Sequence, residues 1–104
     1  MKLKVFAMIS VTSIRVDGKN FTGLHAELPE SPPLLVIIAE KGFVMCGFLN
    51  VETAEKLNVT AAVVSGVKTF DDVLNGQVKA VTSKAKSLGI EAGMKGVEAL
   101  KQMG

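Results

Sequence analysis

Six consecutive apolar residues, Leu34 to Ala39, constrain this chain more than any other feature. A strand with one wet face alternates apolar and polar residues, whereas a run without alternation is typical of a strand buried on both faces. We therefore expect Leu34–Ala39 to form the central strand of a sheet. The run is far shorter than the roughly 20 apolar residues that a membrane span needs, so no membrane partner is expected.

Three further strands are predicted around this one. Residues Val5–Val16 are rich in Val, Ile and Thr, and Asp17-Gly18 is a strong hairpin signal because glycine accepts a positive φ. The return strand is Phe21–Leu28, whose Thr22, Leu24, Ala26 and Leu28 side is the more apolar one. After the central strand, a tight turn at Glu40–Gly42 leads into an antiparallel partner at Phe43–Phe48.

The second half of the chain changes character. Asn50 is placed to cap a helix over Val51–Leu57, and Ala61–Val64 reads as a short buried strand. Thr69 followed three residues later by Asp72 resembles a capping box, which predicts that a helix begins there.

We expect that helix to continue to Leu88, with a kink at Gly76 and Gly89 in the C′ position. The support is an apolar stripe at i, i+3, i+7 and i+10, formed by Val78, Val81, Ala85 and Leu88. A last helix is predicted over Gly96–Met103.

The resulting order, β-β-β-β-α-β-α-α, predicts an α+β fold with a mostly antiparallel or mixed sheet and helices on one face. We expect residues 1–104 to be one compact α/β domain. Apolar residues make up 48% of the chain, and a small domain cannot hide them all. We therefore expect a homo-oligomer, with a dimer favoured, whose interface is the uncovered sheet face or the stretch Phe43–Leu49.

Charge and cysteine content bear on partners and location. The net charge is +2, Arg15 is the only arginine, and the chain has no Trp or Tyr, which argues against a nucleic-acid partner. The single cysteine, Cys46, cannot pair within the chain, which fits a reducing compartment. A cytoplasmic protein is therefore expected.

The chain resembles a known family in three stretches. These are the strand and turn Leu34–Asn50 with its Met45-Cys46-Gly47 step, the turn Gly66–Phe70, and the tail Leu88–Leu100 with its Gly93-Met94-Lys95-Gly96 step. The chain is similar there to the YunC-like family of small bacterial and archaeal domains of unknown function. The resemblance implies a compact mixed α/β domain and no assigned activity, so it provides no catalytic or ligand residues.

Cys46 is a weak catalytic candidate. Gly47 beside it would let a ligand approach, and a thiol whose pKa is lowered by a nearby cation could act as a nucleophile. The alternative is a small buried hydrophobic residue, the usual state of a free cysteine. His25, the only histidine, is a second weak candidate as a general base. It is otherwise a surface or interface residue, and no metal site is expected, because one His and one Cys lack ligand spacing.

The turn Gly66–Thr69 joins a strand to a helix start. Free amides at a helix N-terminus attract anions, and Lys68 adds positive charge, so Gly66, Lys68 and Thr69 are weak candidates for a small anionic ligand. The alternative is an ordinary connection with a satisfied cap. The string does not match a nucleotide-binding P-loop, because Val67 interrupts the Gly-Lys pair.

These observations favour a non-catalytic, homo-oligomeric domain that binds a small ligand or a protein, with no cofactor. The alternative is a small enzyme with an interface site near Cys46, His25 and the Gly66–Thr69 turn. Convergence of Cys46, His25 and Lys68 on one deep pocket would favour the enzyme.

Overall fold

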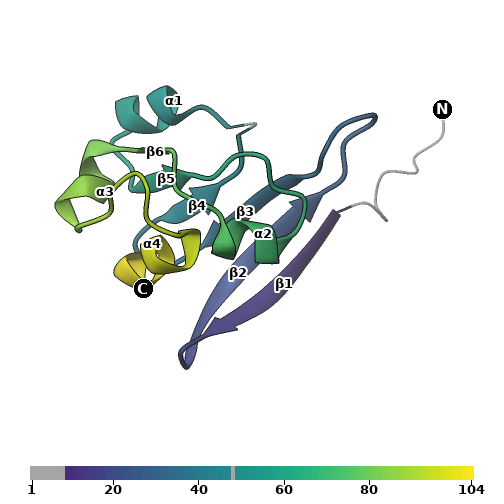
Figure 1. Cartoon of the computed structure of the whole chain (residues 1–104), viewed down its shortest axis with the longest axis horizontal. Coiled ribbons are helices and arrows are strands. Elements are labelled where there is room, and N and C mark those ends of the chain that lie inside the picture. The colour runs from purple at the N-terminus through teal and green to yellow at the C-terminus, as the bar shows by residue number, and fades with distance from the viewer. Residues whose placement is uncertain (1–8, 48) are drawn as a thin grey trace.

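The computed structural model describes residues 9–47 and 49–104 and contains a mixed six-stranded sheet with four helices. The strands lie in sequence order, and only the β4–β5 pair is parallel. Figure 1 shows the long β1–β2 hairpin at one side and α2 and α4 over the sheet. The elements are β1 (Ile9–Val16), β2 (Lys19–Ala26), β3 (Leu34–Ile38), β4 (Phe43–Met45), α1 (Val51–Lys56), β5 (Ala61–Val63), α2 (Phe70–Asn75), β6 (Ala80–Val81), α3 (Ser83–Ser87) and α4 (Gly96–Met103).

Local signals in the sequence account for most element boundaries. Asp17 and Gly18 have φ values of 52° and 81°, the left-handed pair that the tightest hairpin turns require. The Asn50 side chain accepts hydrogen bonds from the amides of Glu52 and Thr53 at 2.7 and 3.2 Å, and α1 begins there as predicted. The predicted last helix has the bounds of α4. The first part of the predicted first strand, residues 5–8, and position 48 lie outside the described residues.

The sheet has two unlike faces. On the first, which we call the covered face, fully buried Leu35 and Ile37 of β3 pack with side chains of α2, α3 and α4. Val36 points to the opposite face, where Ala54 of α1 packs with Met45, Ala61 and Val63. The α+β class and the mixed sheet are thus confirmed. The expectation that all helices share one face is wrong for α1, because β4 and β5 present an apolar surface on each side.

Over β1–β3 no helix of the described residues covers the second face, and we call this region the open face. Its one charged side chain is Arg15, beside the hairpin turn, and its other side chains are Ile9, Val11, Ser13, Asn20, Thr22, Leu24, Ala26, Leu34, Val36 and Ile38. Ile9, Val11 and Ile38 are 53%, 66% and 44% exposed. The more apolar side of β2 therefore faces outward, whereas Phe21 on its other side is buried under the helices.

The single helix expected up to Leu88 is wrong: the chain forms α2, β6 and α3 there. Gly76 is extended, with φ −77° and ψ 162°, and a Cβ at this position would lie 2.6 Å from a methyl carbon of Val64. The chain then adds to the sheet edge, since the Lys79 amide donates to the Val63 carbonyl at 2.8 Å. Val78 and Val81 of the apolar stripe lie beside and in this edge strand, whereas Ala85 is a buried residue of α3 and Leu88 is the C-cap of α3. Gly89 does occupy the C′ position after α3, with φ 87°.

Thr82 fixes the junction between β5 and α3. Its hydroxyl oxygen accepts from the Ala61 amide at 3.1 Å and from the Ala85 amide at 3.3 Å. The same hydroxyl donates to the Val59 carbonyl at 2.7 Å, and the residue is only 1% exposed. One side chain thus satisfies backbone groups of a strand, a loop and a helix start.

Glu55 links α1 to α3 from outside the sheet. Its carboxylate oxygen accepts a hydrogen bond from the Ser83 amide at 2.8 Å. The hydrogen bond from the Ser83 backbone is the main cause that lowers the pKa of Glu55 below its ordinary value of 4.5, followed by the Ser83 side chain and then by Lys86.

Replacing Thr82 with valine keeps the volume and removes the hydroxyl. We expect the free energy of unfolding to fall by about 1–3 kcal/mol, because buried backbone groups lose their partner. Denaturant titration measures the change, and Thr82→Ser, which keeps the hydroxyl, should be much closer to the natural chain. Equal losses in the two variants would contradict the role given to the hydroxyl.

The Glu55 cap should make stability depend on pH. A folded-state pKa below the unfolded value means that the carboxylate stabilises the fold above about pH 4.5, and that this contribution is lost as pH falls through the folded pKa. Glu55→Gln should therefore lower the urea midpoint at neutral pH, and this deficit should shrink at acid pH, as the pH falls below about 4.5. Glu30→Gln, at an exposed loop residue, is the control. A Glu55→Gln deficit of equal size at neutral and acid pH would contradict the ionic cap.

Candidate functional site

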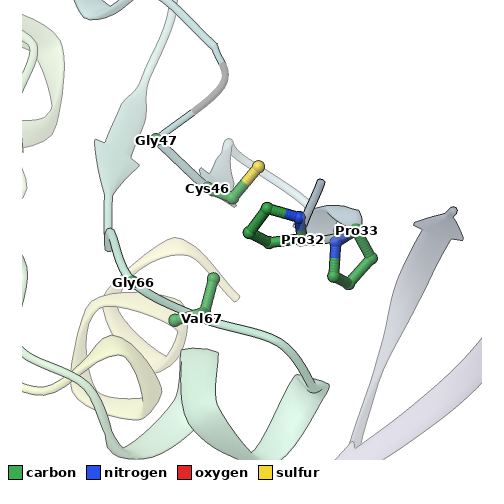
Figure 2. A pocket seen from close by; sticks show the side chains of 6 residues that line it. All are labelled: Pro32, Pro33, Cys46, Gly47, Gly66 and Val67. Atoms are coloured by element: carbon green, nitrogen blue, oxygen red, sulfur yellow. The ribbon is translucent and has the colours of Figure 1, made fainter. Parts of the chain in front are cut away.

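A hollow of about 220 Å³ lies where the loop before β3 meets the ends of β4 and β5. It is lined by Pro32, Pro33, Cys46, Gly47, Gly66 and Val67. Figure 2 shows the Cys46 sulfur directed toward the two proline rings, with Val67 on the other wall. Two of the six lining residues are glycines, so backbone forms part of the wall. The hollow combines an apolar lining with one thiol.

Cys46 is held by the neighbouring strand. Its amide donates to the Leu35 carbonyl at 3.0 Å, and its sulfur accepts from the Leu35 amide at 3.4 Å. The residue is 2% exposed and belongs to the core of the covered face. Its thiol is therefore one wall of the hollow and at the same time a packed core side chain.

His25 does not join Cys46. It pairs with Leu35 across β2 and β3, and Leu35 in turn bonds to Cys46, so one strand separates the two residues. Two strand spacings set the backbones of His25 and Cys46 about 10 Å apart, and the hydrogen-bond partner that the structure gives the Cys46 sulfur is the Leu35 amide. The His25 ring instead meets Phe70 of α2 edge to face, with the ring centroids 6.3 Å apart.

The Gly66–Thr69 turn is divided between the hollow and the start of α2. Gly66 lines the hollow with φ 74°, a conformation that favours glycine. Thr69 caps α2 by accepting from the Asp72 amide at 3.1 Å, as the capping-box pattern predicts. The Asp72 carboxylate accepts from the Lys68 amide at 3.0 Å. An anion at this turn would have to compete with that carboxylate for the Lys68 amide.

Of the candidates, the structure brings together Cys46 and Gly66. It leaves His25, Lys68 and Thr69 outside the lining. The sequence analysis did not identify Pro32, Pro33 and Val67 as lining residues. Within residues 9–47 and 49–104, no three His, Cys, Asp or Glu side chains cluster as metal ligands would. None of the helices in those ranges has the length and apolar character needed to cross a bilayer.

A second hollow lies on the opposite side of the sheet, between β4 and α1. Its volume is about 410 Å³, and its lining includes Phe43, Met45, Leu49, Thr53, Leu57 and Val59. Leu57 is 68% exposed. The expected apolar stretch Phe43–Leu49 contributes three of these residues, whereas the contribution of α1 could not be read from the sequence.

Burial of Cys46 predicts slow alkylation. In the folded protein we expect iodoacetamide to modify Cys46 at least about tenfold more slowly than free cysteine near pH 7, because a packed thiol is shielded from reagent. The rate is followed by mass spectrometry, with urea-unfolded protein as the control that restores access. A rate above that of free cysteine would contradict the packed thiol and favour the enzyme alternative.

Comparison with known proteins places the chain among uncharacterised relatives. A family model described as a domain of unknown function (DUF1805) matches residues 45–103. The uncharacterized protein YunC of Bacillus subtilis (strain 168) is 34% identical over 100 residues, which cover 92% of this chain and 98% of the relative. The crystal structure of TA1206, a protein of unknown function from Thermoplasma acidophilum, has a TM-score of 0.88 and 36% identity, covering 93% of this chain and 94% of that one.

The family model spans more than half of the chain, and the relative from Bacillus subtilis is matched over nearly its whole length. The segments that carried the resemblance, Leu34–Asn50 and Leu88–Leu100, lie within or next to the matched residues. The chain therefore belongs to the DUF1805 family of YunC-like domains, whose members named here have no described function.

Proposed function

We propose that this chain is a non-catalytic domain that works as a homodimer, with the open face as its interface. The observation that carries the proposal is the surface over β1–β3, which no described helix covers, which has one charged side chain, and where Val11 is 66% exposed. Contiguous apolar patches of this kind on small domains mark association sites more often than not. Arg15 and Asn20 lie on the same face near the hairpin turn and supply a polar rim.

The size of the open face sets the expected strength of the dimer. Strands β1 and β2 are eight residues long and β3 is five, so the open face measures at most roughly 14 Å by 27 Å, or about 380 Å². Two such faces would bury about 760 Å² in total, which is less than the roughly 1,200 Å² of the smallest standard interfaces. A dimer that dissociates on dilution is therefore expected.

A second copy fits this face better than a partner of another kind. A highly charged partner would find a single charge, Arg15, among the described side chains of the open face. Two copies present the same mostly apolar surface to each other, and the exposed Arg15 lies at its rim beside the hairpin turn, so the apolar middle buries no unpaired charge.

The enzyme alternative has less support. Its two named catalytic candidates, Cys46 and His25, lie on either side of Leu35, and the Lys68 amide is already bonded to Asp72. A small ligand in the hollow beside Cys46 fits the proposal, because that hollow lies on the covered-face side of the sheet. An anionic ligand at the Gly66–Thr69 turn stays a prediction. A cytoplasmic location is part of the proposal, supported by the free thiol of Cys46.

Self-association is tested by light scattering over a concentration series. We expect twice the chain mass of 11.0 kDa at high concentration and a shift toward the monomer on dilution. Val11→Asp would bury an unpaired charge in the interface, so its dimer should dissociate at least about tenfold more readily.

Thr12→Asp is the matched control. It places the same charge on the same strand, at an exposed residue on the opposite face, and should leave the dimer intact. A natural chain that stays at 11.0 kDa at about 100 µM would overturn the proposal. So would equal weakening by the two variants, because the interface would then not be the open face.

A further inference from the structure

The open face ends in a step. Helix α1 packs over β4 and β5 on the same side of the sheet, through Ala54 against Met45, Ala61 and Val63. A helix is about 10 Å thick, which matches the spacing between two packed sheets. The surface of one copy is thus a low platform, β1–β3, bounded on one side by a ridge, α1.

The apolar hollow lined by Phe43, Met45, Leu49, Thr53, Leu57 and Val59 lies at the foot of this ridge. Nearly all of its accessible wall is carbon, and Leu57 on the ridge is the most exposed of the large apolar side chains that the structure describes. Well-packed protein interiors contain few voids, so an apolar hollow beside an association face is suited to receive a side chain of the partner copy.

The ridge restricts how two copies can meet. A two-fold axis that runs across the strands, within the interface, would set α1 against α1 and hold the platforms apart. A two-fold axis along the strands sets the platform of each copy beside the ridge of the other. Only the second arrangement brings the bare strands into contact, and it puts β1 of one copy next to α1 of its partner.

The strand register identifies which side chain reaches the hollow. Val11 pairs with Leu24, Leu24 with Val36, and Val36 with Met45, so these four residues form one row across the sheet. Rotation about a two-fold axis parallel to the strands leaves each residue's position along the strand direction unchanged. Val11 of the partner copy therefore arrives at the level of Met45, which lines the hollow.

We propose that each copy inserts Val11 into the partner's hollow between β4 and α1, against Leu57. This inference rests on the proposed homodimer and specifies its geometry. It explains why Val11 and Leu57, at opposite sides of the same face, are the two most exposed large apolar side chains among the described residues. Each covers the other across the interface.

Cysteine cross-linking distinguishes the two axes. Val11→Cys and Leu57→Cys variants are prepared separately, mixed, and treated with a short bismaleimide; the natural Cys46 is buried and serves as an internal reference for non-specific reaction. Peptide mass mapping then identifies the linked residues. We expect a link between position 11 of one copy and position 57 of the other, and much less product from Val11→Cys alone. Thr53→Cys, in the same hollow, is a second acceptor should the Leu57 variant fold poorly.

Thr12→Cys mixed with Leu57→Cys is the control, because position 12 points to the opposite face and should not cross-link. A dominant link between two copies of Val11→Cys would overturn the proposed geometry while the dimer itself stands. A dimer mass with no cross-link from position 11 to either acceptor would overturn the geometry in the same way. A monomer mass in light scattering would overturn the dimer, and the geometry with it.

Discussion

The need to cover β3 on two sides organises this structure. Leu35 and Ile37 are fully buried among apolar neighbours on one face, and Val36 is buried among apolar neighbours on the other, so both faces of the strand exclude water. Helices α2, α3 and α4 supply side chains for the first face, and the second receives only the six-residue α1. Burial stabilises by about 25 cal/mol per Å² of apolar surface, so the side chains that α1 does not reach retain a driving force for association.

The covered face also explains what Cys46 does in the fold. Its sulfur accepts the Leu35 amide, and its side chain packs in the same core as Ile37 and Val44. A free cysteine behaves as a small hydrophobic residue in such surroundings. The hollow beside it exists because the adjoining chain offers glycine at positions 47 and 66 and rigid prolines at 32 and 33, which leave space that larger side chains would fill.

Much of this fold could be read from local chemistry. The turn at Asp17-Gly18, the caps at Asn50 and Thr69 and the bounds of α4 depend on a few neighbouring residues, and the sequence predicted them correctly. The helix expected from Thr69 to Leu88 failed because its apolar stripe belongs to two elements: Val78 and Val81 lie beside and in the edge strand β6, and Ala85 and Leu88 lie in and beside α3. The choice is made by a contact distant in sequence, Gly76 against Val64.

The site was predictable only in part for a related reason. Cys46 and Gly66 follow strands that turned out to be parallel neighbours, so they share an edge of the sheet and one hollow. His25 was a candidate because it is the only histidine, yet the register places Leu35 between it and Cys46. Register and the side of the sheet on which a helix packs are tertiary properties. The packing of the helices likewise decides that the more apolar side of β2 faces outward, which its composition does not determine.

The two hollows lie on opposite faces of the sheet. Ligand binding beside Cys46 and self-association through the open face would therefore use different surfaces. The hollow beside Cys46 belongs to the covered face, where Val67 and Cys46 join the core under the helices. The hollow under α1 belongs to the open face, with Met45 at its floor. A dimer built through the open face leaves the Cys46 hollow facing away from the interface. Self-association and ligand binding in that hollow therefore share no side chain. Substitutions on β1 would change self-association without contacting the hollow beside Cys46.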